Sequence, residues 1–303
     1  MSTPTPIVCF GEILWDMLPT GRRPAGAAFD LALQLHQLGQ PVQLVSRVGD
    51  DELGRELLAF SARQGLENTL VQQSKTHLTG VVKTTVCPDE GVVCKILEPV
   101  AWDYIQYSAV LRMAVSESGM LVYSSLSARN SASRETLYRL LLDAPYKVFN
   151  VTLRAPHYSR EVVKYLLQHA DFVRLEQDEL TEIMSWLGRP ATPDTALAWL
   201  AGHFGLHAIC VTQGACGALL WTNNELFQSA GKLPLVAGSS ASGGAEFLAS
   251  LLVEWRRPRA PAECLQRASA ALAAQPPDPL ARSVESPSSS LNPTAASQLR
   301  PLV

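Results

Sequence analysis

The chain has 303 residues, and 47% of them are hydrophobic, which is enough to bury one large core or two modest ones. Its 25 basic and 28 acidic residues are interleaved and give a formal charge of −3, which excludes a broad basic surface for nucleic acid or for an anionic membrane. No apolar run approaches the roughly 20 residues of a membrane helix, and residues 1–19 lack the basic flank of a signal peptide, so we expect a cytoplasmic protein.

A strand–helix–strand unit is predicted at the start of the chain. Residues 6–10 form an apolar run closed by Gly11, and residues 41–49 repeat this pattern of a buried strand. Between them, residues 27–39 have apolar side chains at helical spacing and end in a glycine. The order of these three segments predicts a βαβ unit.

Strands and helices continue to alternate along the chain. Helices are predicted at residues 51–65, 131–144, 159–170, 178–188, 192–205 and about 245–255, and strands at residues 119–126, 146–153, 171–177 and 207–214. This alternation predicts an α/β fold with a mostly parallel sheet that helices flank on both faces.

One stretch breaks the alternation. Residues 79–103 contain two extended runs joined by the turn-forming sequence Pro-Asp-Glu-Gly, which predicts a small β lid. Residues 275–303 are rich in Pro, Ser and Ala without a sustained period, so we expect an irregular tail there. The predicted organisation is one domain over residues 1–274, with lid segments near 12–30 and 80–103.

Two N-terminal blocks resemble a known family. Residues 11–39 contain Gly-Glu-Ile-Leu-Trp-Asp and then Ala-Gly-Ala-Ala-Phe-Asp, and residues 46–57 contain Arg-Val-Gly-Asp-Asp-Glu-Leu-Gly, in which Asp50 or Asp51 should cap a helix. The succession resembles the signature of PfkB-type carbohydrate kinases, above all the fructokinases, and the similarity continues to about residue 255. It implies a ribokinase-like fold and transfer of phosphoryl from ATP, with Mg²⁺, to fructose or a related hexose. It also implies a homodimer through the lid.

The resemblance assigns a sugar pocket to the N-terminal segment and the lid. Asp16 is the acid that would hydrogen-bond sugar hydroxyls, and Gly26 and Asp30 lie in the block that continues the pocket, where Asp30 replaces the family's asparagine. Trp102 and Arg154 are further candidates for contact with sugar or phosphate. The alternatives are a surface acid for Asp16, a hydrophobic anchor of the lid for Trp102 and a surface salt bridge for Arg154.

A nucleotide side is implied by two further motifs. Glu179 matches the acid of the family's Asn-x-x-Glu element, which organises magnesium-bound water, although Glu176 stands where the asparagine is expected. Thr212, Gly214 and Gly217 match the Thr-x-Gly-x-x-Gly turn at the nucleotide subsite. The alternatives are the start of a helix for the acidic run and a tight turn for the glycines.

The decisive family motif is rewritten in this chain. The family has Asp-Thr-x-Gly-Ala-Gly-Asp, whose last Asp takes the proton of the sugar hydroxyl, and residues 238–247 here read Gly-Ser-Ser-Ala-Ser-Gly-Gly-Ala-Glu-Phe. One register puts Ala245 at the position of the lost Asp, a second puts Gly244 there, and a third makes Glu246 a surrogate base.

The amides of Ser242, Gly243 and Gly244 would still form an anion hole at a helix start. We therefore predict a fructokinase-like protein with impaired or lost activity. An active divergent kinase that uses Glu246, and a non-catalytic sugar-binding or interaction protein, are the alternatives. A dinucleotide-dependent oxidoreductase would need a Gly-x-Gly-x-x-Gly turn, which the sequence lacks.

Overall fold

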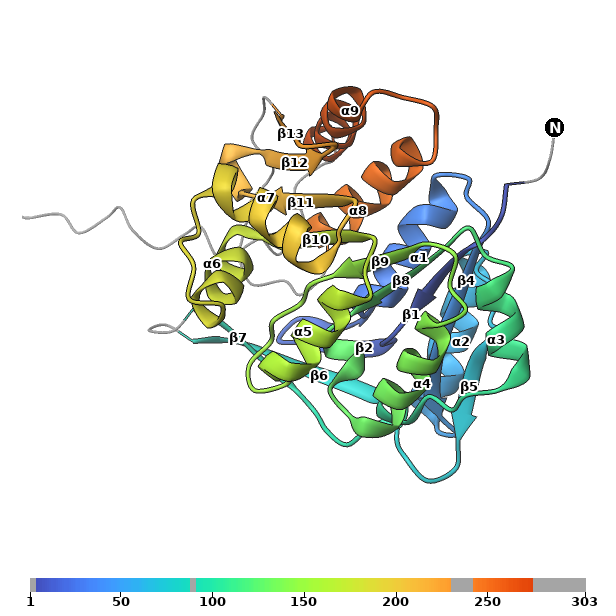
Figure 1. The fold of residues 1–303 in the computed structure, drawn as a ribbon. Helices are drawn as coiled ribbons and strands as arrows, with labels where there is room; N and C mark the ends of the chain where they lie inside the picture. The colour runs from blue at the N-terminus through green and yellow to red at the C-terminus, as the bar shows by residue number, and fades with distance from the viewer. Residues whose placement is uncertain (1–3, 88–90, 230–241, 275–303) are drawn as a thin grey trace, which may run out of the picture.

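The computed structural model describes residues 4–87, 91–229 and 242–274 (Figure 1). These residues form a nine-stranded sheet in the order β13-β12-β11-β10-β9-β8-β1-β4-β5. The parallel strands are β1 (Ile7–Phe10), β4 (Val42–Gly49), β5 (Val71–Ser74), β8 (Met120–Ser124), β9 (Lys147–Asn150), β10 (Phe172–Glu176) and β11 (Ala208–Thr212). An antiparallel edge follows, made of β12 (Ala218–Thr222) and β13 (Glu225–Gln228).

Helices cover both faces of this sheet. One face carries α1 (Ala27–Gln37), α2 (Glu52–Arg63), α8 (Ser242–Trp255) and α9 (Pro261–Ala273), and the other carries α3 (Ala109–Ser116), α4 (Ser131–Leu141), α5 (Arg160–Gln168), α6 (Gln177–Trp186) and α7 (Pro193–Phe204). The interior strand β1 contributes to the cores on both faces. Ile7 and Cys9 face the α1–α2–α8–α9 side, and Val8 and Phe10 face the α3–α7 side. The predicted mostly parallel sheet flanked by helices is confirmed.

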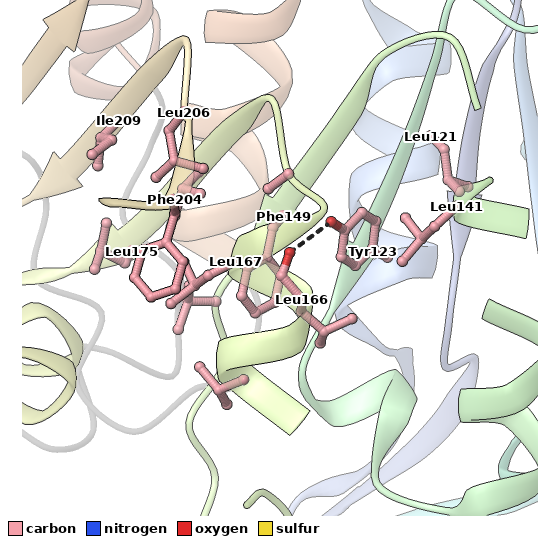
Figure 2. Close-up of a cluster of buried hydrophobic side chains, with 14 of the residues drawn as sticks. Leu121, Tyr123, Leu141, Phe149, Leu166, Leu167, Leu175, Phe204, Leu206 and Ile209 are labelled. Atoms are coloured by element: carbon pink, nitrogen blue, oxygen red, sulfur yellow. Dashed lines mark hydrogen bonds between the residues drawn. The ribbon is translucent and has the colours of Figure 1, made fainter. Parts of the chain in front are cut away.

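The core on the α3–α7 face is continuous from one end of the sheet to the other. Figure 2 shows part of it, from Leu121 near β1 to Ile209 on β11. Tyr123 places its ring against Phe149 and donates its hydroxyl hydrogen to the carbonyl of Leu166 at 3.3 Å. The buried hydroxyl of Tyr123 thus has a partner on the adjacent helix.

A second, four-stranded sheet lies beside the main one. It has the order β3-β2-β6-β7 and is formed by β2 (Leu14–Leu18), β3 (Gly21–Ala25), β6 (Gly80–Cys87) and β7 (Gly91–Ile96). Strand β2 pairs in parallel with β6, so the segments near residues 12–30 and 80–103 join across the sequence. This sheet confirms the predicted β lid.

Several local predictions hold and some elements were not foreseen. Asp51 caps α2 by accepting the amide hydrogen of Gly54 at 2.8 Å, as expected for one of the two acids there. The short helix α3 and the edge strands β12 and β13 were not predicted. The predicted tail at residues 275–303 and most of the segment before α8 lie outside the described residues.

Candidate functional site

The candidate site lies at one edge of the main sheet. Strands β1, β9, β10 and β11 run parallel, so their carboxyl ends meet at the same edge. The start of α1 follows the lid strand β3 there, and the start of α8 packs against α1. Ligands of open α/β sheets bind beyond the carboxyl ends of such strands.

Asp16 is held inside the lid. Its Oδ1 accepts a hydrogen bond from Thr84 Oγ1 at 2.6 Å, and its Oδ2 lies 3.3 Å from Nε of Arg23. The side chain is 2% exposed, which removes the reading of Asp16 as a surface acid. Because both partners are lid residues, Asp16 is oriented by the lid; its contact with sugar stays a prediction.

The junction between β3 and α1 requires a glycine. Gly26 has a φ of 132°, and a Cβ at this position would lie 2.4 Å from the carbonyl oxygen of Glu12. Glu12 follows β1, is 1% exposed and accepts the amide hydrogen of Ala27 at 2.9 Å. The carboxylate of Glu12 thus binds the N-terminus of α1, where the helix dipole favours negative charge.

Asp30 lines a pocket of about 90 Å³ together with Arg23, Ala245 and Glu246. Burial raises the pKa of Asp30 to about 7; Arg23 and the Gly26 amide oppose the rise, and the acids Glu12 and Glu246 add to it. Below that pH the carboxyl keeps its proton and offers both a donor and an acceptor, as the family's asparagine would. In mildly acidic solution Asp30 would therefore resemble an asparagine in its hydrogen bonding.

Three consecutive residues at the start of α8 have different neighbours. Gly244 faces β10, because a Cβ built on it would lie 3.3 Å from Nη2 of Arg174. Ala245 is 7% exposed and packs in the core of the α1–α8 face, and the partly buried Glu246 lines the pocket with Asp30. Among the positions proposed for the base, Glu246 is the one that brings a carboxylate to the predicted sugar-binding residues.

The anion hole is described only in part. Helix α8 begins at Ser242, whose side chain lies outside the described residues, and continues through Gly243 and Gly244. The first amide groups of any α-helix have no partner within the helix. An anion hole at this place is compatible with the helix start and stays a prediction.

The ends of β10 and β11 are joined by Arg174, a residue that the sequence analysis did not single out. Its Nη2 donates a hydrogen bond to Oγ1 of Thr212 at 2.8 Å, and Thr212 is 8% exposed. Beyond Thr212 the chain makes a short turn in which Gly214 and Gly217 both have positive φ. The turn is thus a tight connection between antiparallel strands, and its role in nucleotide binding stays a prediction.

Glu179 ties α6 to the loop after β9. Its Oε1 accepts the amide hydrogen of Leu153 and its Oε2 that of Glu176, both at 2.9 Å. Burial raises the pKa of Glu179 to about 7, against the opposing effect of Arg174 and of these two amides. The described residues contain no group of three or more Asp, Glu, His or Cys side chains that would hold a metal. An indirect role of Glu179 in Mg²⁺ binding stays a prediction.

Comparison with known proteins decides the family. A family model described as pfkB family carbohydrate kinase matches residues 14–278. This chain belongs to the pfkB family of carbohydrate kinases. It is 23% identical to the probable fructokinase-7 of Arabidopsis thaliana over 270 residues, which cover 82% of this chain and 78% of that protein.

Solved structures of fructokinases share the fold of this pfkB-family chain. The fructokinase of Xylella fastidiosa with bound ATP matches with a TM-score of 0.76 and 20% identity, covering 88% of this chain and 90% of that one. A double mutant of the fructokinase of Vibrio cholerae O395, in its fructose-, ADP- and potassium-bound form, matches with a TM-score of 0.73 and 20% identity over 91% and 94% of the two chains. These matches confirm the ribokinase-like fold. None of the helices in the described part of the chain is long and apolar enough to cross a membrane.

Two other predicted site residues of this pfkB-family chain, Trp102 and Arg154, do not line the pocket of Asp30 and Glu246. Trp102 is fully buried, and the guanidinium of Arg129 lies 3.9 Å from the centre of its ring, an arrangement that fits an anchor of the lid. Arg154 is exposed in the loop after β9, and the described residues form no ion pair with it. Contact of either residue with substrate stays a prediction.

The sequence analysis missed four charged residues around the site. They are Glu12, Arg23, Arg129 and Arg174. A signal was available for two of them, since Arg174 interrupts an apolar strand pattern and Glu12 follows a buried strand directly. For the two arginines outside strand cores, the sequence holds no such signal, because an arginine in a turn or a lid strand is ordinarily solvated.

Proposed function

We propose that this chain is a fructokinase-like kinase that transfers phosphoryl from ATP to a hydroxyl of fructose or a related hexose, at a reduced rate, with Glu246 as the base. The observation that carries the proposal is the shared pocket of Glu246 and Asp30, next to the Arg23–Asp16 pair. The names of its relatives support it, since several are fructokinases and two solved structures hold ATP or fructose with ADP.

The residues of the chain divide the chemistry between them. Asp16 and Asp30 would hold sugar hydroxyls, while Glu246 accepts the proton of the hydroxyl that attacks the terminal phosphorus of ATP. The new oxygen–phosphorus bond forms as the bond to the ADP oxygen breaks. Amides at the start of α8 stabilise the negative charge of the transferred group. Mg²⁺, when bound, would neutralise phosphate charge; both oxygens of Glu179 already accept amides, so the metal would reach it through water.

The reduced rate follows from the identity of the base. A glutamate is one methylene longer than the family's aspartate, and Glu246 shares its pocket with another carboxyl and an arginine. A misplacement of about 1 Å in a catalytic group costs roughly 100-fold in rate. We therefore expect turnover well below that of an aspartate-containing relative.

The test is an assay that couples ADP release to a readout across a panel of sugars. We expect slow turnover of the wild type with fructose and at least about a 100-fold loss in Glu246→Gln. Ala245→Asp should not restore the rate if Glu246 is the base, because Glu246 already brings a carboxylate to the same pocket. Glu135→Gln on the exposed side of α4 is the matched control. Unchanged turnover in Glu246→Gln would contradict the role of Glu246.

A second candidate, non-catalytic sugar binding, is favoured by the alanine at position 245 in one register of the motif. It predicts no ADP release from the wild type with any sugar, together with sugar binding in calorimetry that Asp16→Asn removes. The proposal includes a cytoplasmic location and a homodimer through the lid.

A further inference from the structure

The guanidinium of Arg174 is buried with incomplete hydrogen bonding. Its side chain is 7% exposed, and within the described part of the chain Nε has no hydrogen-bond partner. Nη2 donates to Thr212 Oγ1 at 2.8 Å and lies 3.5 Å from Oε1 of Glu176, a carboxylate whose side chain is 53% exposed. A buried guanidinium ordinarily satisfies more of its five donors, because a buried donor without a partner is unfavourable.

This cation lies against the first turn of α8. A Cβ on Gly244 would be 3.3 Å from Nη2 and 3.5 Å from Nη1, so the missing side chain of Gly244 leaves room for the guanidinium at the helix start. The N-terminus of a helix carries partial positive charge and unpaired amides, and a cation there is unfavourable. A buried cation thus lies beside the positive end of a helix, and an anion bound at the helix start would relieve both.

We propose that Arg174 and the first amides of α8 together bind the terminal phosphoryl group of a nucleoside triphosphate. The inference deepens the proposed function and rests on it for the identity of the nucleotide. The family resemblance already implies that the helix amides bind the phosphoryl group. The new element is Arg174 of β10, which the structure places beside them. Thr212 holds the guanidinium in place, and Glu176 competes with the phosphoryl group for it.

The first experiment uses inorganic phosphate as the probe and requires no turnover. Calorimetric titration of the full chain with phosphate should show binding that Arg174→Met weakens at least about tenfold and Arg174→Lys weakens less. Glu176→Gln should tighten binding by up to about fivefold, because it removes the competing carboxylate. Arg112→Met, which removes an exposed arginine on α3, is the control and should change nothing.

The second experiment locates the anion within the nucleotide. The dissociation constants of ADP and of a non-hydrolysable ATP analogue are measured with Mg²⁺ for the same variants. Arg174→Met should weaken the ATP analogue at least about tenfold and ADP by less than about twofold, because ADP lacks the terminal group. Melting temperatures without ligand identify any variant that fails to fold, and Arg174→Lys then carries the comparison.

The outcomes separate this inference from the proposed function. Phosphate binding that survives in Arg174→Met, or equal weakening of ADP and the ATP analogue, overturns the inference. A wild type that binds phosphate through Arg174 but releases no ADP with any sugar contradicts the proposed function and supports the inference. A wild type that binds no phosphate overturns the inference whatever its activity.

Discussion

The carboxyl of Asp30 makes the pocket sensitive to pH. Burial raises its pKa from 3.8 to about 7, so the folded chain keeps this proton where the unfolded chain has lost it. Between about pH 4 and pH 7 the folded state therefore binds more protons, and the contribution of Asp30 to stability falls as pH rises through this window. The cost of the buried charge is absent at acidic pH and complete above about pH 7.

Asp30→Asn tests the predicted direction of this pH dependence of stability. The variant should be more stable than the wild type at pH 8 and should lose most of that advantage at pH 5, as measured by urea unfolding. Asp194→Asn removes an exposed carboxyl on α7 and should show no such dependence. An advantage of Asp30→Asn that is equal at the two pH values would contradict the raised pKa.

At the scale of elements, the joint between β3 and α1 depends on the absence of a side chain. Gly26→Ala places a Cβ 2.4 Å from the carbonyl oxygen of Glu12 at a φ of 132°, so the strand or the helix must shift. We expect the free energy of unfolding to fall by about 1–3 kcal/mol. Gly202→Ala in the last turn of α7, where a Cβ meets open space, should raise it by up to about 1 kcal/mol. Equal effects of the two substitutions in urea unfolding would rule out the close approach.

The elements could be predicted wherever one local pattern decided them. Buried parallel strands such as β1 and β8 are apolar runs, and α4 and α5 combine helical spacing with a polar cap. The edge strand β13 was missed because its exposed residues alternate weakly over a short length. Helix α3 has only eight residues and follows an irregular segment, so periodicity could not separate it from a loop.

The site was less predictable than the elements for a physical reason. The pairing of Asp16 with Arg23 depends on the antiparallel pairing of β2 with β3, which was not predicted strand by strand. The pocket of Asp30 and Glu246 depends on the contact between α1 and α8, which are more than 200 residues apart. The hydrophobic periodicity of a short segment carries no information about such a long-range contact. The resemblance supplied candidates for the pocket, whereas Arg174 is marked in the sequence only as a charge within an apolar strand, and its position against Gly244 comes from the structure.

At the scale of the whole molecule, a buried ion pair connects the lid to the main sheet. Arg129, which follows β8, donates Nε to Oδ1 of Asp103 at 2.6 Å and Nη2 to Oδ2 at 2.8 Å. Nη2 also donates to the carbonyl of Leu97 at 2.8 Å, just beyond the lid strand β7. The two charged side chains are 3% and 1% exposed, so each is the buried counter-charge of the other.

Arg129→Met should lower the free energy of unfolding by about 3–5 kcal/mol, because it leaves the carboxylate of Asp103 buried and unpaired. The double variant Arg129→Met/Asp103→Asn should recover part of this loss, which a double-mutant cycle in urea would measure. Arg112→Met breaks an exposed pair on α3 and should leave stability almost unchanged. A loss in Arg129→Met no greater than in Arg112→Met would show that the pair does not hold the lid.

The acids around Arg23 also affect which molecules the pocket binds and releases. Among the described residues, the acids Glu12, Asp16, Asp30 and Glu246 lie near Arg23, and this excess of acids favours a neutral polyol over an anion in the pocket. Aldonic acids and sugars that already carry phosphate should therefore bind more weakly than neutral sugars. The product acquires negative charge in the same step that completes the reaction, and the carboxyls that received the neutral sugar would then favour its departure.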